Sequence, residues 1–435
     1  MSLPFETKIF FALFLCVTAV LQVKAQEFEQ PPIRYSQSQP ENRVSRLIER
    51  VSAGEVQLKY EERLGYLRSL LAEFDVPVSS QMLVFSKTSL QRQRIAPRTP
   101  RALYFTDDVY VGYCQQGDVL EISAVDPQLG TVFYTLDQHD ADKPRFLRQT
   151  DNCLICHGSS QTKDVPGHLV RSVFSDAGGL PILSAGTYRI DHTSPLEKRW
   201  GSWYVTGTHG EQKHLGNLII RGQSLPDDVD NSSGLNLVGL AGRFDTSRYL
   251  SPHSDIVALM VLEHQADAHN YITRANFLTR QAMHYQQALN RELHEPADHL
   301  WESTKSRIKN AGEPLVEYLL FSGEAKLTAP IRGVSGFAEE FASLGPRDSQ
   351  GRSLRVFDLT TRLFKYPCSY LIYSPSFAAL PKEVKDYVLQ RLQEVLSGAD
   401  HSDKFAHLTA GDRRAIREIL AQTLPDWQTF AARNK

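Results

Sequence analysis

The sequence predicts an α+β protein in which a β-rich central region is flanked by an N-terminal helical segment and a C-terminal helical region. Three observations predict this fold class. Apolar residues recur at helical spacing before residue 80, short β-rich runs separated by turn residues fill positions 81–245, and a long stretch without Gly or Pro follows. The chain has 435 residues, of which 41% are hydrophobic, enough for a large buried core.

The first 25 residues are predicted to be a secretory signal peptide. Lys8 precedes an apolar run of 13 residues, and Ala25 ends a small-residue site of the kind at which such peptides are cut. The apolar run is shorter than the roughly 20 residues that cross a bilayer. We therefore expect an exported, periplasmic or otherwise secreted chain that is soluble and has no integral membrane segment once residues 1–25 are removed.

Three regions follow the signal peptide. Residues 26–80 are expected to form two amphipathic helices broken near Gly54, and residues 81–245 an antiparallel meander. Residues 246–435 are expected to be helical, with the longest helix from Asp255 to Leu289. Further helices are expected over 297–309, 313–322, 355–365, 382–397 and 411–422.

Composition excludes two classes of protein. The 48 Lys and Arg against 50 Asp and Glu leave no basic excess for a nucleic-acid surface, and the 10% aromatic content argues against intrinsic disorder. Five cysteines are too few for a disulfide scaffold in a chain of this length. A cysteine cluster therefore needs a chemical explanation.

One such cluster is the CxxCH motif at residues 153–157, in the connection that enters the expected meander. The chain's Cys and His frequencies predict about 0.002 chance occurrences of this pattern. A disulfide between cysteines three apart is sterically awkward, and a zinc site would need a second ligand pair. A thioredoxin-like dithiol should open a helix, whereas Gly158-Ser159-Ser160 indicates a loop. Covalent haem attachment explains all three side chains.

Residues 153–157 resemble the haem-attachment motif of c-type cytochromes. The resemblance implies that Cys153 and Cys156 attach one haem c through thioethers and that His157 is the proximal ligand of its iron. It covers five residues of the chain.

The motif lies in mid-chain, and no Met occurs between Met82 and Met260. Small class I cytochromes c have their motif near the N-terminus and a distal Met downstream. The chain is therefore more similar to large exported proteins that carry a single cytochrome c motif, and a small class I fold alone is not expected.

The sixth iron ligand stays open at this point. In a meander, His209 and His214 flank one turn, while His168 and His192 lie at the opposite end, so both pairs should not face one haem. The candidates for the distal position are His209, His168, His214 and Met260.

Other candidate residues follow from the haem prediction. Glu263 and His264 on the long helix are candidate acid or base groups if the protein is an enzyme. Cys114 and Cys368 remain as either a disulfide or two thiols. Candidate partners of the haem propionates and ring are Arg148, Arg171, Arg189, Arg199, Trp200 and Trp203.

Three functional hypotheses result, and whether the protein is an enzyme stays open. The leading one is an exported single-haem protein that transfers electrons to or from an unidentified redox partner protein. The second is a haem oxidoreductase whose sixth iron position is open or displaceable. The third is a haem-based sensor or interaction module.

Overall fold

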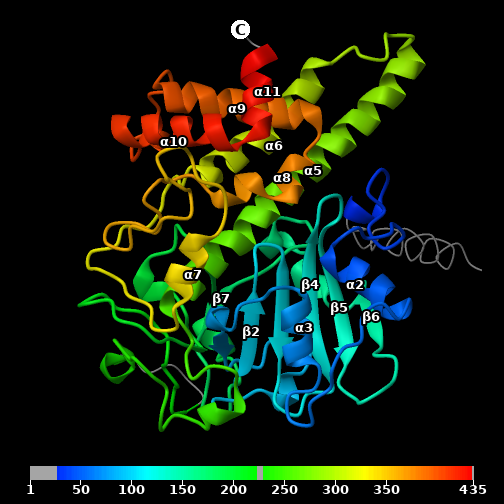
Figure 1. Ribbon diagram of the computed structural model, residues 1–435. Coiled ribbons are helices and arrows are strands. Elements are labelled where there is room, and N and C mark those ends of the chain that lie inside the picture. Colours follow the sequence, from blue (N-terminus) through cyan, green and yellow to red (C-terminus); the bar gives the residue numbers. More distant parts are fainter. Residues whose placement is uncertain (1–26, 223–228, 434–435) are drawn as a thin grey trace, which may run out of the picture.

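The computed structural model describes residues 27–222 and 229–433, so the predicted signal peptide lies outside the described residues. The described chain is α+β, with a large antiparallel sheet between an N-terminal helical segment and a C-terminal group of helices (Figure 1). Its strands are β1 (Met82–Val84), β2 (Arg101–Phe105), β3 (Val109–Tyr113), β4 (Val119–Asp126), β5 (Gly130–Asp137), β6 (Phe146–Gln149), β7 (Arg171–Val173), β8 (Thr187–Arg189) and β9 (Trp203–Tyr204).

Strands β1 to β6 form the predicted antiparallel meander. The sheet order is β6-β5-β4-β3-β2-β1-β9, and β9 pairs antiparallel with β1. The longest pairing joins β4 to β5, with Ile122 opposite Tyr134. The CxxCH motif follows β6, so it leaves this meander and does not enter it, contrary to expectation.

The chain after His168 departs from the meander predicted up to residue 245. Among its described residues, only the short pair β7–β8 and the two-residue β9 form strands there. Trp200 and Ser202 both have positive φ, 66° and 67°, which interrupts an extended strand at this point. Residues 205–220 are instead held by turns and side-chain hydrogen bonds, such as that from Val205 N to Asn217 Oδ1 at 2.9 Å.

The two faces of the sheet pack against different parts of the chain. Helices α2 (Arg43–Ser52) and α3 (Leu67–Glu73) bury Leu47 and Leu70 against one face, together with Tyr104 and Val111 of the sheet. The predicted break near Gly54 is confirmed, with φ of 77° at that residue. The second helix, α3, begins only at Leu67, after turns at residues 62–64 and 66.

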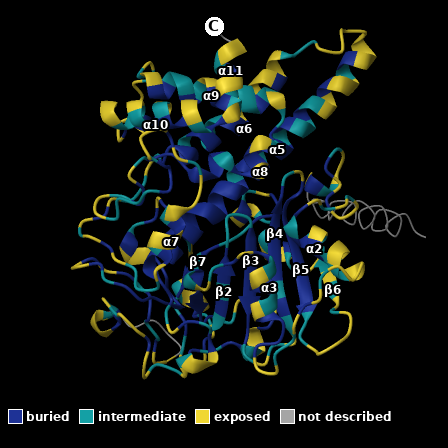
Figure 2. Cartoon of the chain, in the orientation of Figure 1, coloured by how far each residue is buried: buried dark blue, intermediate teal, exposed yellow. Residues whose placement is uncertain are grey.

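Helix α5 (Ile256–Leu293) covers the opposite face and confirms the long helix predicted from Asp255. The Asp255 carboxylate accepts hydrogen bonds from Val257 N at 2.8 Å and Ala258 N at 3.3 Å, which caps the helix. Its first half is buried on all sides, whereas its far end carries exposed residues (Figure 2). No helix in the described part of the chain has the length and apolar character needed to cross a membrane.

The C-terminal helices differ from prediction at three points. Helix α6 (Glu302–Leu319) is continuous, so the predicted break between the segments 297–309 and 313–322 is wrong. Gly312 lets α6 approach α9 (Lys382–Ser397) closely, since a Cβ would lie 2.6 Å from the Tyr387 ring. The predicted helix over 355–365 is absent, and this segment is irregular. Helices α7, α8 and α11 were not predicted. The remaining helices are α4 (Leu154–His157), α7 (Phe337–Ser343), α8 (Pro375–Ala378), α10 (Ala410–Thr423) and α11 (Pro425–Arg433).

Cys114 and Cys368 are two buried free thiols and form no disulfide. Burial raises the pKa of each thiol to about 12, which keeps both protonated.

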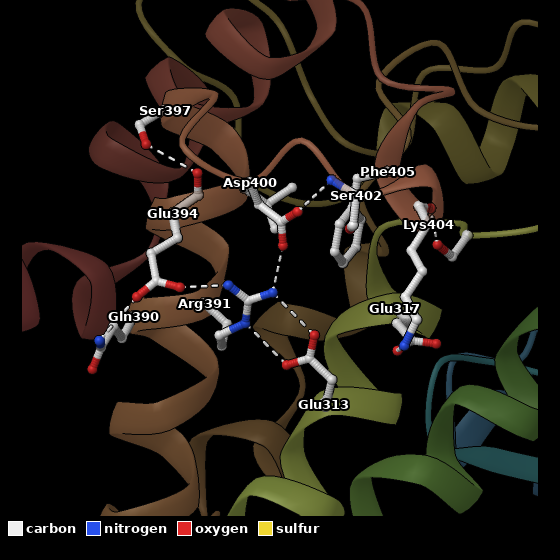
Figure 3. Close-up of polar contacts among 12 residues, drawn as sticks. Glu313, Glu317, Gln390, Arg391, Glu394, Ser397, Asp400, Ser402, Lys404 and Phe405 are labelled. Carbon is white, nitrogen blue, oxygen red and sulfur yellow. Dashed lines mark hydrogen bonds and ion pairs between the residues drawn. The ribbon is translucent and has the colours of Figure 1, made fainter.

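Arg391 of α9 joins the C-terminal helices through three carboxylates (Figure 3). Its guanidinium binds Glu313 of α6 through two contacts of 3.0 Å, Asp400 at 2.6 Å, and Glu394 on its own helix. The Arg391 side chain and a backbone hydrogen bond from Ser402 lower the pKa of Asp400 to about 2.

We predict that Asp400→Asn lowers the free energy of unfolding by about 1–2 kcal/mol at pH 7. The depressed pKa of Asp400 means that its ion pair stabilises the fold above about pH 4 and that this contribution is lost as the pH falls toward 2. Urea denaturation at pH 7, 4 and 3 should therefore show the difference between parent and variant shrinking. Asp403→Asn, at an exposed position nearby, is the matched control. A difference independent of pH would contradict the role given to this carboxylate.

Candidate functional site

The two cysteines and the histidine of the CxxCH motif, Cys153, Cys156 and His157, line one cavity of about 350 Å³. Cys156 and His157 lie on α4, a single helical turn that Cys153 precedes as the N-cap residue, shortly after the edge strand β6. Both Cys153 and Cys156 are free thiols, the first partly buried and the second exposed. Two thiols and an imidazole therefore face a common space beside the sheet.

His157 is held by two hydrogen bonds to Gly167. The ring Nδ1 lies 2.9 Å from the Gly167 carbonyl oxygen, and Gly167 N donates to the His157 carbonyl at 2.8 Å. Because a carbonyl only accepts, Nδ1 carries the proton and Nε2 carries the lone pair. Burial lowers the pKa of His157, which favours this neutral form. The Phe133 ring, 4.9 Å away between centroids, packs against the imidazole.

Asn270 of α5 fixes the segment that carries the Gly167 carbonyl. Its carboxamide accepts from His168 N at 3.1 Å and donates to the His168 carbonyl at 2.8 Å. A Cβ at position 167 would lie 2.0 Å from Asn270 Oδ1, so only glycine allows this close approach. Neither Gly167 nor Asn270 was a candidate from the sequence, since no spacing rule links these residues to the CxxCH motif.

The walls of the cavity come from the inner face of the sheet and from α5. Tyr110, Ser123 and Phe133 lie at matching positions on three neighbouring strands, and Leu262 and Ala266 lie one turn apart on the helix. Side chains of one face alternate along each strand, so this face is shared by the cavity and the core beside α5. The cavity thus combines apolar walls from the sheet and α5 with polar and charged side chains such as Ser123, Arg101 and Glu121.

Two arginines give the cavity its positive charge. Arg101 forms an ion pair with Glu121 at 3.0 Å, whereas Arg171 has no ion pair within the described residues. Trp203, which also lines the cavity, donates from Nε1 to the Arg171 carbonyl at 2.8 Å. Of the propionate candidates, Arg171 and Trp203 therefore lie in the cavity.

The other propionate candidates are engaged elsewhere. Each has partners outside the cavity lining. Arg148 donates to the carbonyls of Tyr35 and Ser38, Arg189 pairs with Asp191 and Asp267, Arg199 pairs with Glu263, and Trp200 donates to Glu263.

His168 is the one distal-ligand candidate that shares the cavity with His157. Its Nε2 lies 2.8 Å from the Ser123 hydroxyl, and its Nδ1 lies 3.3 Å from the Thr131 hydroxyl. The Tyr110 ring packs against it with centroids 3.9 Å apart. Burial holds the pKa of His168 well below its usual value, so the ring is neutral with both nitrogens occupied.

The remaining distal candidates lie outside the cavity lining. His209 and His214 pack against each other with centroids 4.7 Å apart, as expected for residues that flank one turn. His209 Nε2 accepts from Asn236 N, and His214 Nδ1 accepts from Gly216 N. Met260 is 3% exposed within the core around α5.

Glu263 and His264 are fully buried on α5, away from the cavity. The Glu263 carboxylate pairs with Arg199 and accepts from Trp200 Nε1 at 3.2 Å; burial raises its pKa, and Arg199 opposes that rise. His264 lies between the Ser369 hydroxyl, 2.8 Å from Nε2, and His192, 2.9 Å from Nδ1. The structure therefore does not bring these two groups together with the CxxCH motif.

We predict that Asn270→Leu lowers the free energy of unfolding by about 3 kcal/mol, because the buried N–H and C=O of His168 lose their partners. The 157–167 hydrogen bonds should loosen as well, so hydrogen exchange at Gly167 N should become faster. The matched control is Asn290→Leu at the far end of α5, which removes hydrogen bonds to Pro296 and His299. Equal protection of Gly167 N in both variants would contradict the role of Asn270.

No group of three or more His, Cys, Asp or Glu side chains that could hold a metal ion occurs in residues 27–222 and 229–433. Haem iron does not need such a group, because the porphyrin supplies four of its ligands. Comparisons with protein-family models, with curated proteins and with solved structures give no match for this chain.

Proposed function

We propose that the chain is an exported c-type cytochrome protein that binds one haem c covalently and transfers electrons. Cys153 and Cys156 would form the thioethers, and His157 would ligate the iron as the proximal residue. One observation carries the proposal: both thiols and the imidazole line the same cavity, while the hydrogen bond from Nδ1 to Gly167 leaves the Nε2 lone pair for a metal.

The cavity fits the group in two further respects. Its apolar walls, including Phe133 and Leu262, suit a planar macrocycle, and Arg171 without an ion pair suits a propionate. The carbonyl partner of His157 Nδ1 is the kind of contact that fixes the tautomer and ring orientation of a metal-bound histidine. Export, which the predicted signal peptide supports, agrees with haem attachment outside the bacterial cytoplasm.

When bound, haem supplies one-electron chemistry at its iron. The chain's contribution is to hold His157 neutral, to pack Phe133 against its ring and to exclude water on the sheet side of the cavity. The electron partner would be a second redox protein that meets the exposed side of α4, where Cys156 lies at the surface.

A second function, a haem oxidoreductase or sensor with a displaceable sixth position, is favoured by the hydrogen bonds of His168. Both of its ring nitrogens are engaged by Ser123 and Thr131, so this ring would have to give up a hydrogen bond to reach a metal. His209, His214 and Met260 lie outside the cavity lining.

We predict that protein matured with haem keeps it under denaturing conditions and that the double variant Cys153→Ala/Cys156→Ala loses nearly all of it. The pyridine haemochrome spectrum should report two thioether links in the parent and one in each single variant. Cys114→Ala, a buried cysteine outside the cavity, is the matched control and should retain covalent haem.

His157→Phe tests the iron ligand separately. The variant should keep the thioethers while the spectra of both oxidation states change, since the proximal nitrogen is removed. Absence of covalent haem in the parent protein, or unchanged spectra in His157→Phe, would contradict the proposal.

Carbon monoxide distinguishes the two functions: if the hydroxyl partners of His168 hold that ring away from the iron, as the second function requires, carbon monoxide should bind rapidly to the reduced haem-loaded protein. His168→Phe should leave the spectrum without carbon monoxide nearly unchanged. Failure of carbon monoxide to bind would indicate a firmly held sixth ligand and would favour electron transfer over the second function.

A further inference from the structure

A second and larger cavity, of about 690 Å³, lies apart from the CxxCH motif. Its walls come from the turn between β2 and β3, from α5, from α7 and from residues 370–376. They are rich in aromatic rings, contributed by Phe105, Phe337, Phe341, Tyr370 and Tyr373. Such walls favour a planar apolar ligand over an aliphatic one.

His269 of α5 brings an unused hydrogen-bond acceptor to this cavity. Its Nε2 lies 2.7 Å from the Asp107 carbonyl oxygen, so Nε2 carries the proton and Nδ1 carries the lone pair. The side chain is 1% exposed, and Nδ1 has no hydrogen-bond partner among the described residues. Burial lowers the pKa of His269, which favours the neutral ring. A ligand hydroxyl could donate to this nitrogen.

Arg355 brings unused donors to the same cavity. Its guanidinium lies between two rings, 4.5 Å from the Phe341 centroid and 4.4 Å from that of Tyr370. One end pairs with Asp107, but Nε and Nη1 are buried without an acceptor in the described part of the chain. The side chain is 6% exposed. Buried donors of this kind call for an oxygen atom of a ligand.

The charges around the cavity argue against an ionic ligand. Arg355 and Arg43 have carboxylate partners, and the carboxylates that line the cavity outnumber its arginines, so the cavity offers no excess of positive charge to an anion. A cation would meet the Arg355 guanidinium at the buried end. The charged residues that line the cavity are Glu41, Asp75, Asp107, Asp108 and Glu340, against Arg43, Arg46 and Arg355.

We propose that this cavity binds a neutral hydroxylated aromatic compound of the phenol class. The ring would pack against Phe337 and Tyr370, the hydroxyl would donate to His269 Nδ1, and an oxygen lone pair would accept from Arg355. This site is distinct from the cavity proposed for haem, and none of its residues attaches that group.

Gln265 connects the walls of the two cavities. Its carboxamide donates to the Tyr110 hydroxyl at 2.6 Å and accepts from the Tyr370 hydroxyl. Tyr110 lines the cavity of the CxxCH motif, and Tyr370 lines the second cavity. A ligand that moves Tyr370 is therefore expected to perturb this hydrogen-bonded chain as well.

The test is calorimetric titration of the full, haem-matured protein with 4-methylphenol, with 4-methylanisole and with benzoate. We expect 4-methylphenol to bind with a dissociation constant of about 0.1–1 mM. The methyl ether, which cannot donate, should bind at least about tenfold more weakly, and His269→Phe should weaken 4-methylphenol by a similar factor.

Leu344→Trp provides a variant that does not disturb the buried core, because Leu344 lines the cavity and is 50% exposed. It should abolish binding by filling the entrance. Leu293→Trp, at a similarly exposed position on α5 outside the cavity lining, should bind as the parent does.

No binding of 4-methylphenol up to about 10 mM, equal binding by Leu344→Trp, or tighter binding of benzoate would each overturn the proposal. Covalent haem is measured separately by the haemochrome spectrum, so failure of this proposal leaves that of a c-type cytochrome standing, and the reverse also holds.

Discussion

The two hydrogen bonds between the Asn270 carboxamide and the backbone of His168 are the contacts on which the geometry of the CxxCH motif depends. They attach an irregular loop to the middle of a long buried helix. The loop carries the Gly167 carbonyl, and that carbonyl sets the tautomer and direction of the His157 imidazole. The position of one imidazole is thus set by a helix more than a hundred residues away in the sequence, because the backbone of a loop has few rigid neighbours of its own.

Other polar side chains in the first half of α5 hold neighbouring segments in the same way as Asn270 does. The polar side chains of a helix that is buried on all sides need partners from other segments, since a buried polar group without a hydrogen bond lowers the stability of the fold. Glu263 forms an ion pair with Arg199, and Asp267 forms ion pairs with Lys163 and Arg189. His264 is hydrogen-bonded to Ser369. All of these partners except Arg189, which ends strand β8, lie outside the sheets and the α-helices. Ion pairs and hydrogen bonds from the polar side chains of α5 therefore hold these segments against the core.

Prediction from the sequence succeeded where local signals are strong. The absence of Gly and Pro after Asp255 indicated α5, short β-rich runs after residue 81 indicated an antiparallel meander, and Gly54 marked the break between α2 and α3. It failed where the fold overrides local preference: α6 is continuous between the segments 297–309 and 313–322, and Trp200 and Ser202 take positive φ within the region predicted to be a meander.

The residues of the candidate site were also predictable from the sequence only in part. The thiols and His157 are adjacent in the sequence, so their shared cavity could be anticipated. Asn270 and the hydroxyl groups of Ser123 and Thr131 could not, because they reach His168 only through the fold. Glu263 and Met260 were candidates on the strength of residue type alone, and such residues on a helix without a solvent face pack inward.

Helix α5 contributes wall residues to both cavities, so its geometry fixes how these residues are placed relative to one another. Leu262 and Ala266 line one cavity and His269 lines the other, at spacings of four and three residues, so all three lie along one stripe of the helix within about 10 Å. Inserting or deleting a single residue between Ala266 and His269 would rotate one set of wall residues by about 100° relative to the other. This stretch of the helix is therefore expected to accept substitutions in its side chains far more readily than any change in its length.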